Sequence, residues 1–599
     1  MLARPTLPVI VFFAALLALF IAMPFVGGPY AIKFATRLMV LAIFVVSLDL
    51  LIGITGLVSF GHAAFFGVGA YAAYFVSPDY EAGNLALVLA AGIALGGLAA
   101  LVVGSFAMLT RGFYFIMVTL AAGQMLFSLF HDTDIAKGSD GAYVNVKPNL
   151  TVAGRTILDF DSSLQFYLFT LAALIVVYFV LFALARSPFG RALQGIRVNE
   201  TRMSALGYNA YLYKLAAFVV AGAIAGFAGA LFACIDGFVT PELLSWHQSG
   251  LAIMMVVLGG AGTLFGPILG AFAYIALEDL LKTTSLVGEF VSSHWRLGTG
   301  AVLVVAVLLS PDGLAGFFKL FGARAAPAPT PPCADPHAAV DRPARAAKTL
   351  STENLSRNFG ALAAVADVTI RFAPNLVHGI IGPNGAGKTT FTNLMSGAIP
   401  PSSGHVRIDG ADVTGWPAHR IAHVGLGRSY QRTNIFGAFT VAENCALAAQ
   451  ARNGSMLRLS DKAYRDKEAA TVAHALAVAG LADRSATVAS KMSNGEQRQL
   501  EIAMLIASGA DLLLLDEPLA GMGPEETSRV VALLRNLAKD HTVVLIEHDM
   551  DAVFAAADTL TVLVQGKLLA HGTPEDIRRN EAVLEAYLGH HADKSGAHA

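Results

Sequence analysis

The stretch GPNGAGKTT, Gly382 to Thr390, decides the fold of the C-terminal half of this chain. A mostly apolar run, Val377 to Ile381, precedes it and predicts a short buried strand. The residues that follow, FTNLMSG, predict the start of a helix. A glycine-rich loop between a strand and a helix is the setting of a phosphate-binding loop, and the alternative is a glycine-rich turn without a ligand. We expect the phosphate-binding loop.

The residue types in this loop suit the phosphates of a nucleotide. Its glycines leave backbone N–H groups uncovered, so that these groups can wrap the β- and γ-phosphates. Lys388 supplies a positive charge to the same oxygens, and the hydroxyl of Thr389 suits a Mg²⁺ ligand. The residues that we expect to bind the nucleotide are consecutive in the chain: Gly382, Pro383, Asn384, Gly385, Ala386, Gly387, Lys388, Thr389 and Thr390.

Composition places much of the chain in a membrane. The 599 residues have a mean hydropathy of +0.60, and 14% are charged, against roughly 25% in soluble domains. The apolar runs lie in residues 1–321, a predicted membrane domain. Residues 322–347 are rich in proline and alanine and predict a linker, and residues 348–599 have the composition of a soluble α/β domain.

A net charge of −2 argues against a nucleic-acid partner. The three cysteines, Cys234, Cys333 and Cys445, form no disulfide framework and suit a reducing cytosol.

We expect about ten membrane spans. The first, Leu7 to Val26, follows Arg4 but precedes no clear cleavage site, so we interpret it as a retained span rather than a signal peptide. The third span, 60–77, and the eighth, 247–262, contain glycines that predict broken helices. Membranes tolerate broken helices only where protein or a cavity surrounds them. The other predicted spans are 34–53, 60–77, 85–109, 112–130, 164–185, 213–235, 247–262, 264–281 and 296–310.

The charges of the loops predict the orientation. Arg186 to Lys214 holds five basic residues and one acid, Glu200, so this loop should be cytoplasmic. Counting spans from it places both termini in the cytoplasm and the loops Ser77–Asn84 and His131–Gln165 outside. The loop also predicts a short amphipathic helix. It is either a solvated basic segment or a helix that docks on an ATPase.

Four polar residues lie in or at the ends of the predicted spans. An ionisable group inside a membrane is a candidate functional residue, but such groups also cap broken helices or bond across helix contacts. Both interpretations stay open for His62 and Gln124, whereas Asp49 and Glu278 are candidate functional residues.

The soluble domain carries further candidate site residues on both sides of the phosphate-binding loop. Phe359 is placed to stack on adenine, and Gln431 can reach Mg²⁺ or the attacking water. Residues 451–490 predict inserted helices. The buried strand Leu512–Leu515 delivers Asp516 to Mg²⁺ and Glu517 to the hydrolytic water as a general base.

Two further segments point to the γ-phosphate. The helix that begins at MSNGEQRQLEIA can turn its first N–H groups toward this phosphate, and the strand TVVLIEHD presents His548 to it. The helix residues expected to meet the nucleotide are Ser493, Asn494, Gly495 and Glu496.

These motifs resemble those of the ATP-binding cassette (ABC) ATPases. The surrounding segments GRSYQRTNIF, DEPLAGMGPEET and HGTPEDIRRNEAVLEAYLG are similar to the ATPases of bacterial branched-chain amino-acid importers. The segments GLVSFGHAAFFGVGAYAAYF, RGFYFIMVTLA, SPFGRALQGIRVNETRMSALGY and MVVLGGAGTLFGPILGA are similar to the permeases of the same systems. The resemblance therefore implies an all-α polytopic permease fused to an α/β P-loop ATPase.

The resemblance also implies an assembly and a site. Two permeases, two ATPases and a periplasmic solute-binding protein would work together in the bacterial inner membrane, in contact with lipid. ATP with Mg²⁺ would lie between two cassettes, held by the phosphate loop of one and by the signature helix of the other. A homodimer of this chain is the alternative to separate partner chains.

Some residues depart from the family pattern, and some alternatives stay open. Asn494 stands where most cassettes have glycine, Glu496 where glutamine is commoner and Gly523 where aspartate is usual. These departures leave open whether both composite sites hydrolyse ATP.

An exporter or a membrane-anchored regulator is the competing class, and a kinase or GTPase fits less well. Within the importer class, urea, short amides and aromatic acids remain alternative substrates.

Overall fold

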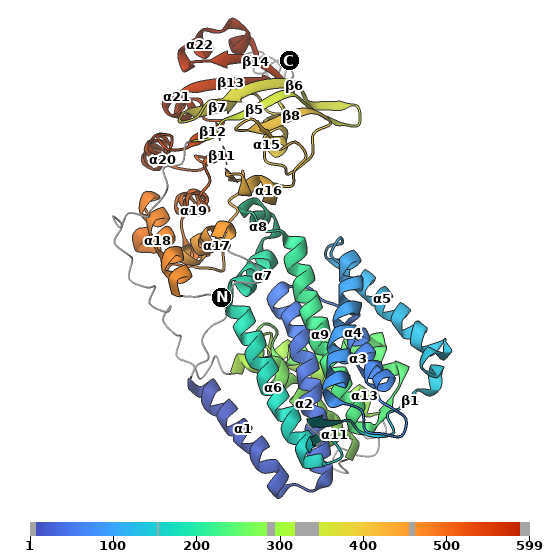
Figure 1. Cartoon of the computed structure of the whole chain (residues 1–599). Coiled ribbons are helices and arrows are strands. Elements are labelled where there is room, and N and C mark those ends of the chain that lie inside the picture. Colours follow the sequence, from blue (N-terminus) through green and yellow to red (C-terminus); the bar gives the residue numbers. More distant parts are fainter. Residues whose placement is uncertain (1–6, 153–154, 284–293, 318–346, 454–461, 587–599) are drawn as a thin grey trace. The chain divides into compact units, whose positions relative to one another are not determined.

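The computed structural model describes residues 7–152, 155–283, 294–317, 347–453 and 462–586 (Figure 1). The chain forms two compact units. One contains residues 1–197 and 211–325, and the other contains residues 198–210 and 326–599. The predicted linker, 322–347, lies almost wholly outside the described residues, so its boundaries stay a prediction.

A helix stands at each of the ten positions where we expected a span. Among the described residues, six helices are long and apolar enough to cross a membrane, counting α2 and α13 with the short helical turns that follow them. Of the remaining four, α3 and α10 are shorter, α11 carries three charged residues, and α1 is counted only from Ala15, so the count of ten spans stays a prediction. The bounds are α1 (Leu7–Val26), α2 (Pro29–Asp49), α3 (His62–Val76), α4 (Leu85–Ala107), α5 (Phe113–His131), α6 (Ser163–Arg186), α9 (Ala210–Asp236), α10 (Trp246–Gly259), α11 (Phe265–Thr283) and α13 (Trp295–Leu309).

Helix α2 forms the centre of the membrane unit. It packs against α6, α10 and α11, and every residue from Leu38 to Asp49 is buried. Glycines bring α4 and α9 close together, because a Cβ at Gly96 would collide with the backbone of Gly222 and Gly226. Small residues at such crossings let helices pack without a hydrophobic driving force.

The predicted break near the eighth span is confirmed. Helix α10 ends at Gly259, and α11 begins at Phe265. Between them, Gly260 and Gly262 adopt left-handed backbone angles, with φ of 107° and 85°. Asp49, at the end of α2, accepts hydrogen bonds from Gly262 N at 2.7 Å and from Leu264 N at 3.0 Å. Asp49 therefore satisfies the backbone that the break leaves free.

His62 begins the short helix α3 and is fully buried. Its Nε2 lies 2.9 Å from Ser47 Oγ on α2, which fits the interpretation that it bonds across a helix contact. Glu278 pairs with Lys282 on the same helix, at 2.5 Å, and Gln124 is exposed.

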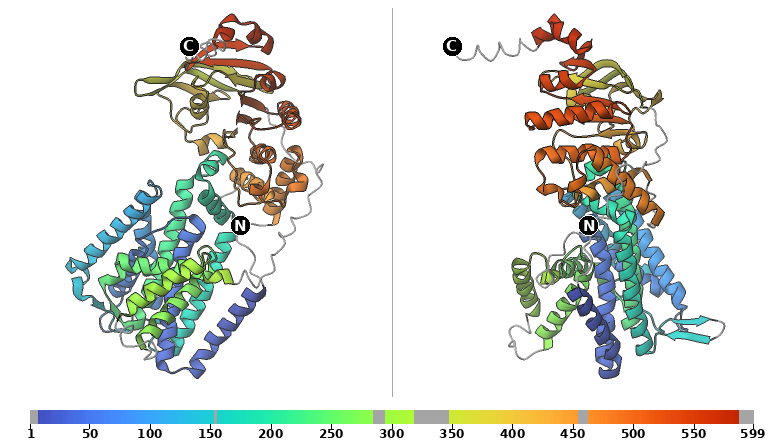
Figure 2. Two further views of the ribbon diagram at one scale, coloured as in Figure 1. Left: turned by 180° about the vertical axis from the view of Figure 1, so that it is seen from behind. Right: turned by 90° about the vertical axis from the view of Figure 1, so that its left-hand side faces the viewer.

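Short strands, which the sequence did not predict, occur in the connections between helices. A hairpin of β2 (Asn149–Val152) and β3 (Arg155–Asp159) projects from the helices of this unit (Figure 2, right). A second pair joins β1 (Ala142–Tyr143) to β4 (Phe238–Val239).

The second unit is built on two sheets. The six-stranded sheet has the order β10-β11-β12-β7-β13-β14, with β13 and β14 antiparallel and the other pairs parallel. Its strands β7, β11 and β12 are buried along their whole length, as parallel strands covered on both faces must be. Their bounds are β7 (Val377–Ile381), β10 (Leu426–Arg428), β11 (Leu512–Asp516), β12 (Thr542–Ile546), β13 (Thr559–Val564) and β14 (Lys567–Gly572).

The second sheet is antiparallel, with the order β6-β5-β8-β9. Both sheets contribute to one apolar core, which includes Val368, Phe391 and Leu514. The strands are β5 (Leu350–Phe359), β6 (Leu362–Phe372), β8 (Ser403–Ile408) and β9 (Ala411–Asp412). The helices are α15 (Lys388–Met395), α16 (Ala418–His423), α17 (Val441–Asn453), α18 (Lys462–Val478), α19 (Asn494–Ala507), α20 (Pro524–Leu537), α21 (Met550–Ala556) and α22 (Pro574–Arg579).

Candidate nucleotide site and the docked membrane loop

The loop after β7 has the geometry that its sequence predicts. Gly385 and Gly387 have φ of 82° and 90°, a left-handed conformation that side chains disfavour. Gly387 caps the N-terminus of α15, so the first N–H groups of this helix face the loop. Lys388 Nζ donates to Gly382 O at 2.6 Å and to Pro383 O at 3.1 Å. Burial lowers the pKa of Lys388, and the nearby Glu517 and Asp516 oppose this shift.

The hairpin that carries Phe359 lies beside the phosphate loop. A Cβ at Gly387 would collide with Ala364 O on β6, the partner of β5. Phe359 ends β5 and is 48% exposed, and the guanidinium of Arg357 lies 4.9 Å from its ring centroid. An exposed ring that is held from one side suits stacking on a planar base.

Strand β11 positions the two acidic residues. Asp516 ends the strand and is 2% exposed, and its N–H donates to Ser429 Oγ at 3.0 Å. Burial raises the pKa of Asp516, with Arg428 opposing. Glu517 follows with φ of 49°, unusual for a residue with a side chain, and its N–H donates to Ile546 O at 2.8 Å. Strained backbone of this kind clusters at functional sites.

The three predicted catalytic residues meet at one atom: Gln431 and His548 both contact the same carboxylate oxygen of Glu517. Gln431 Nε2 donates to Glu517 Oε1 at 3.1 Å, and His548 Nε2 lies 3.0 Å from the same oxygen. They come from three segments, after β10, β11 and β12, which are neighbouring parallel strands. Their carboxyl ends meet at one edge of the sheet, the usual place for a ligand in an α/β fold.

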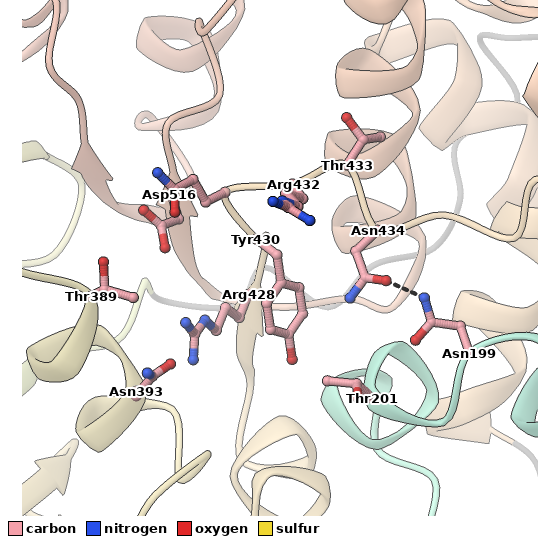
Figure 3. Close-up of a pocket in the computed structure, with 11 residues that line it drawn as sticks. Asn199, Thr201, Thr389, Asn393, Arg428, Tyr430, Arg432, Thr433, Asn434 and Asp516 are labelled. Atoms are coloured by element: carbon pink, nitrogen blue, oxygen red, sulfur yellow. Dashed lines mark hydrogen bonds between the residues drawn. The ribbon is translucent and has the colours of Figure 1, made fainter.

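A cavity of about 400 Å³ opens beside these residues. Thr389 and Asp516 both line it (Figure 3), and Gln431 is a third lining residue. A hydroxyl, a carboxylate and an amide oxygen are hard oxygen donors of the kind that Mg²⁺ accepts, with phosphate oxygens completing its shell. The residues present therefore fit a magnesium ion.

The signature segment forms a tight helix start. Ser493 Oγ accepts from Glu496 N at 3.2 Å, and Ser493 N donates to Glu496 Oε2 at 2.9 Å, which is a capping box. Glu496 Oε1 also pairs with Arg484 at 3.1 Å. The glutamate at this position thus has structural partners in the chain. Asn494 and Gly495 form the first turn of α19.

The basic membrane loop forms two helices where we expected one, α7 (Pro188–Val198) and α8 (Glu200–Leu206). Residues 198–210, with α8, belong to the same compact unit as the ATPase domain. Helix α8 packs against α16 and β10. Of the two interpretations, docking on the ATPase is confirmed.

Arg202 is the centre of this contact. It is fully buried, and Nη1 donates to Arg428 O at 2.8 Å. Tyr208 Oη donates to Leu447 O at 2.8 Å, and Asn199 bonds to Asn434 (Figure 3). Burial lowers the pKa of Arg202, and the carboxylate of Glu501 is the largest opposing charge.

Several residues of this region were missed by the sequence analysis. Arg428 lines the cavity, is 4% exposed and donates to Ser396 Oγ at 2.6 Å. Asn393 lines the same cavity from α15. A signal for Arg428 existed, because the arginine of GRSYQ follows an apolar stretch and needs a partner if it is buried. The roles of Arg202 and Glu501 carried no signal, since their contacts join segments distant in the chain.

Comparison with known proteins places both units. Residues 30–308 match the family model described as branched-chain amino acid transport system / permease component. Residues 365–520 match the ABC transporter model, and residues 567–593 match a model of branched-chain amino acid ATP-binding cassette transporters.

Individual relatives cover each half. The ATP-binding protein BraF of Pseudomonas aeruginosa, from high-affinity branched-chain amino acid transport, is 40% identical over 249 residues, 40% of this chain and 97% of the relative. LivG of Escherichia coli K12 is 38% identical over 248 residues, with the same coverage. The permease LivM of the same organism is 30% identical over 322 residues, 51% of this chain and 74% of the relative. The chain therefore belongs to the branched-chain amino acid ABC transporter family and joins in one polypeptide a multi-pass permease and an ABC ATPase.

Proposed function

We propose that this chain is one permease–ATPase arm of a bacterial inner-membrane importer that uses ATP hydrolysis to take up branched-chain amino acids. The observation that carries the proposal is the contact of the membrane loop with the ATPase site. Arg202, from that loop, donates to Arg428 O, three residues before Gln431. A movement at the nucleotide can thus be passed to the membrane domain through one short segment.

We assign the chemistry to the residues that converge beside the cavity. Glu517 accepts the proton of the attacking water, and Gln431 and His548 hold that carboxylate in place. Lys388 and the N–H groups of residues 382–390 bear the charge of the phosphates. Thr389, Gln431 and Asp516 would hold Mg²⁺, which neutralises phosphate charge when bound.

The signature residues Ser493 to Glu496 would meet the γ-phosphate of an ATP held by a second cassette, and Phe359 would stack on the adenine of this chain's own ATP. The partners are a second permease, a second ATPase and a periplasmic binding protein, and both termini lie in the cytoplasm. Residues 322–347 act as a tether between the two domains.

The substrate class is tested through the binding protein. Calorimetry of the cognate binding protein should show binding of leucine, isoleucine or valine and no binding of urea, short amides or aromatic acids. Selective binding of one of the latter classes would replace the proposed substrate. Failure of any binding protein to co-purify with the chain would instead favour an exporter or a regulator.

A further inference from the structure

Two buried charged residues on α19 hold the segment that carries Gln431. Arg498 and Glu501, one turn apart, are 6% and 1% exposed, and Arg498 Nη1 lies 3.0 Å from Glu501 Oε2. Arg498 Nη1 also donates to Tyr430 O at 2.6 Å, and Nη2 donates to Gln431 O. Beyond Gln431, Asn434 N donates to Glu501 Oε1 at 3.0 Å. The ion pair therefore binds the backbone at Gln431 and on both sides of it.

The geometry of the pair leaves little freedom. Both carboxylate oxygens of Glu501 have a partner, and the planar guanidinium of Arg498 bonds two successive carbonyl groups, which a lysine ammonium cannot do in the same way. A buried ion pair is costly to break by removing one partner, because the remaining charge would stay desolvated. The backbone of residues 430–434 should move with α19 as one body.

The other functional end of α19 is its first turn. Arg498 lies two residues after Glu496, in the same helix as the capping box that shapes the signature segment. In the proposed function, this first turn meets the ATP bound by the partner cassette, whereas Gln431 serves the ATP bound by this chain. Helix α19 thus reaches one composite site with its N-terminus and holds the backbone of the segment that carries Gln431 in the other site.

The membrane loop rests on the same helix. Arg202 Nη2 lies 3.4 Å from Glu501 O and 3.7 Å from Met504 Sδ, while Nη1 bonds Arg428 O. Glu501 therefore has two arginine neighbours. Arg498 pairs with its carboxylate, and Arg202 lies near its backbone oxygen.

We propose that Arg498 and Glu501 are positioning residues that couple the two ATP sites: closure of α19 on the partner's nucleotide sets the position of Gln431 in this chain's own site. The inference rests on the proposed function. The proposal differs from a merely structural role of the pair in what it predicts. Removing the pair should lower the rate of ATP hydrolysis through Gln431 and weaken the communication between the two ATP sites.

The test uses the full chain assembled with its partner subunits in nanodiscs. Arg498→Lys should lower kcat for ATP hydrolysis roughly tenfold to a hundredfold, the cost of an ångström-scale misplacement of a catalytic group. KM for ATP should stay unchanged, because residues 382–390 are untouched. Glu501→Gln, which keeps an acceptor for Asn434 N, is the second variant in case the first does not fold. The matched control is Arg407→Lys, whose pair with Glu353 at 3.1 Å is exposed on the antiparallel sheet.

A double-mutant cycle decides how the pair acts. If Arg498 works through Gln431, the variant with both Arg498→Lys and Gln431→Ala should be no slower than Gln431→Ala alone. The Hill coefficient for ATP should also fall toward 1 in Arg498→Lys. Additive effects in the cycle, an unchanged kcat or an unchanged Hill coefficient would overturn the inference. If the unsubstituted assembly and the Arg407→Lys control do not hydrolyse ATP, the proposed function fails instead.

Discussion

Gln431 Nε2 and Glu517 Oε1 lie 3.1 Å apart, although 86 positions separate them in the chain. The contact joins the segment after β10, the strand against which α8 packs, to the proposed general base. Gln431 is exposed, so its side chain can move when that segment moves. In the proposed function, this pair is therefore the point at which docking of α8 and ATP chemistry meet.

Glu517→Gln should abolish steady ATP hydrolysis while leaving ATP binding intact. The substitution removes the base and keeps the shape, and loss of a general base costs roughly a hundredfold or more in rate. Phosphate release and nucleotide affinity measure the two effects separately. Lys388→Ala is the comparison, because it removes a charge from the phosphate loop and should weaken binding as well. An equal loss of affinity in both variants would refute these roles.

Arg202→Met should uncouple transport from hydrolysis. The substitution keeps an unbranched apolar side chain but leaves Arg428 O without its donor. We expect ATP hydrolysis within about threefold of the unsubstituted rate and at least about a tenfold loss of uptake, as loss of a buried charge-assisted hydrogen bond implies. Arg202→Lys should fall between the two. Uptake and hydrolysis that decline in equal proportion would contradict this account.

Asp49→Asn should destabilise the membrane unit. Gly262 N and Leu264 N bond different oxygens of Asp49, so an asparagine would turn its NH2 donor toward one of these N–H groups. An unsatisfied buried group costs about 1–3 kcal/mol. Thermal unfolding in nanodiscs measures the effect. Glu278→Gln is the control, because its pair with Lys282 is between neighbouring turns of one helix and partly exposed. Equal shifts of the two melting temperatures would show that Asp49 does not hold the break.

Separate expression of residues 1–330 and 344–599 should restore most transport. Residues 198–210 belong to the same compact unit as the ATPase, and a tether that transmits no force only raises the local concentration of the two parts that it joins. Co-purification and uptake are the measurements. Halves that form a complex and hydrolyse ATP, yet move no substrate, would show that residues 322–347 take part in coupling.

The ATPase fold could be predicted from the sequence because its signals are local. The strands around residues 377–381 and 512–515 are continuous apolar runs between loop residues, and both are confirmed as β7 and β11. The inserted helices of residues 451–490 correspond to the end of α17 and to α18. Periodicity and glycine spacing suffice for such elements.

Docking of the basic loop on the ATPase was expected from the family resemblance, but the individual residue contacts between distant segments could not be predicted in this way. Nothing near Arg202 or Glu501 in the sequence indicates that they meet. The capping box of Ser493 and Glu496 was missed, although Ser-x-x-Glu before an apolar run is a sequence pattern typical of a helix start. The strands β2 and β3 were missed because their residues form a short surface hairpin without an apolar core. Pair contacts depend on the whole fold, whereas the motifs do not.

The most direct test is uptake of radiolabelled leucine into proteoliposomes that contain this chain, a second permease and a second ATPase, with the binding protein added outside. The account predicts accumulation that requires ATP inside, that stops when the chain carries Glu517→Gln, and that fails when the chain is reconstituted with the binding protein alone. Uptake without ATP, or uptake that Glu517→Gln leaves unchanged, would contradict it.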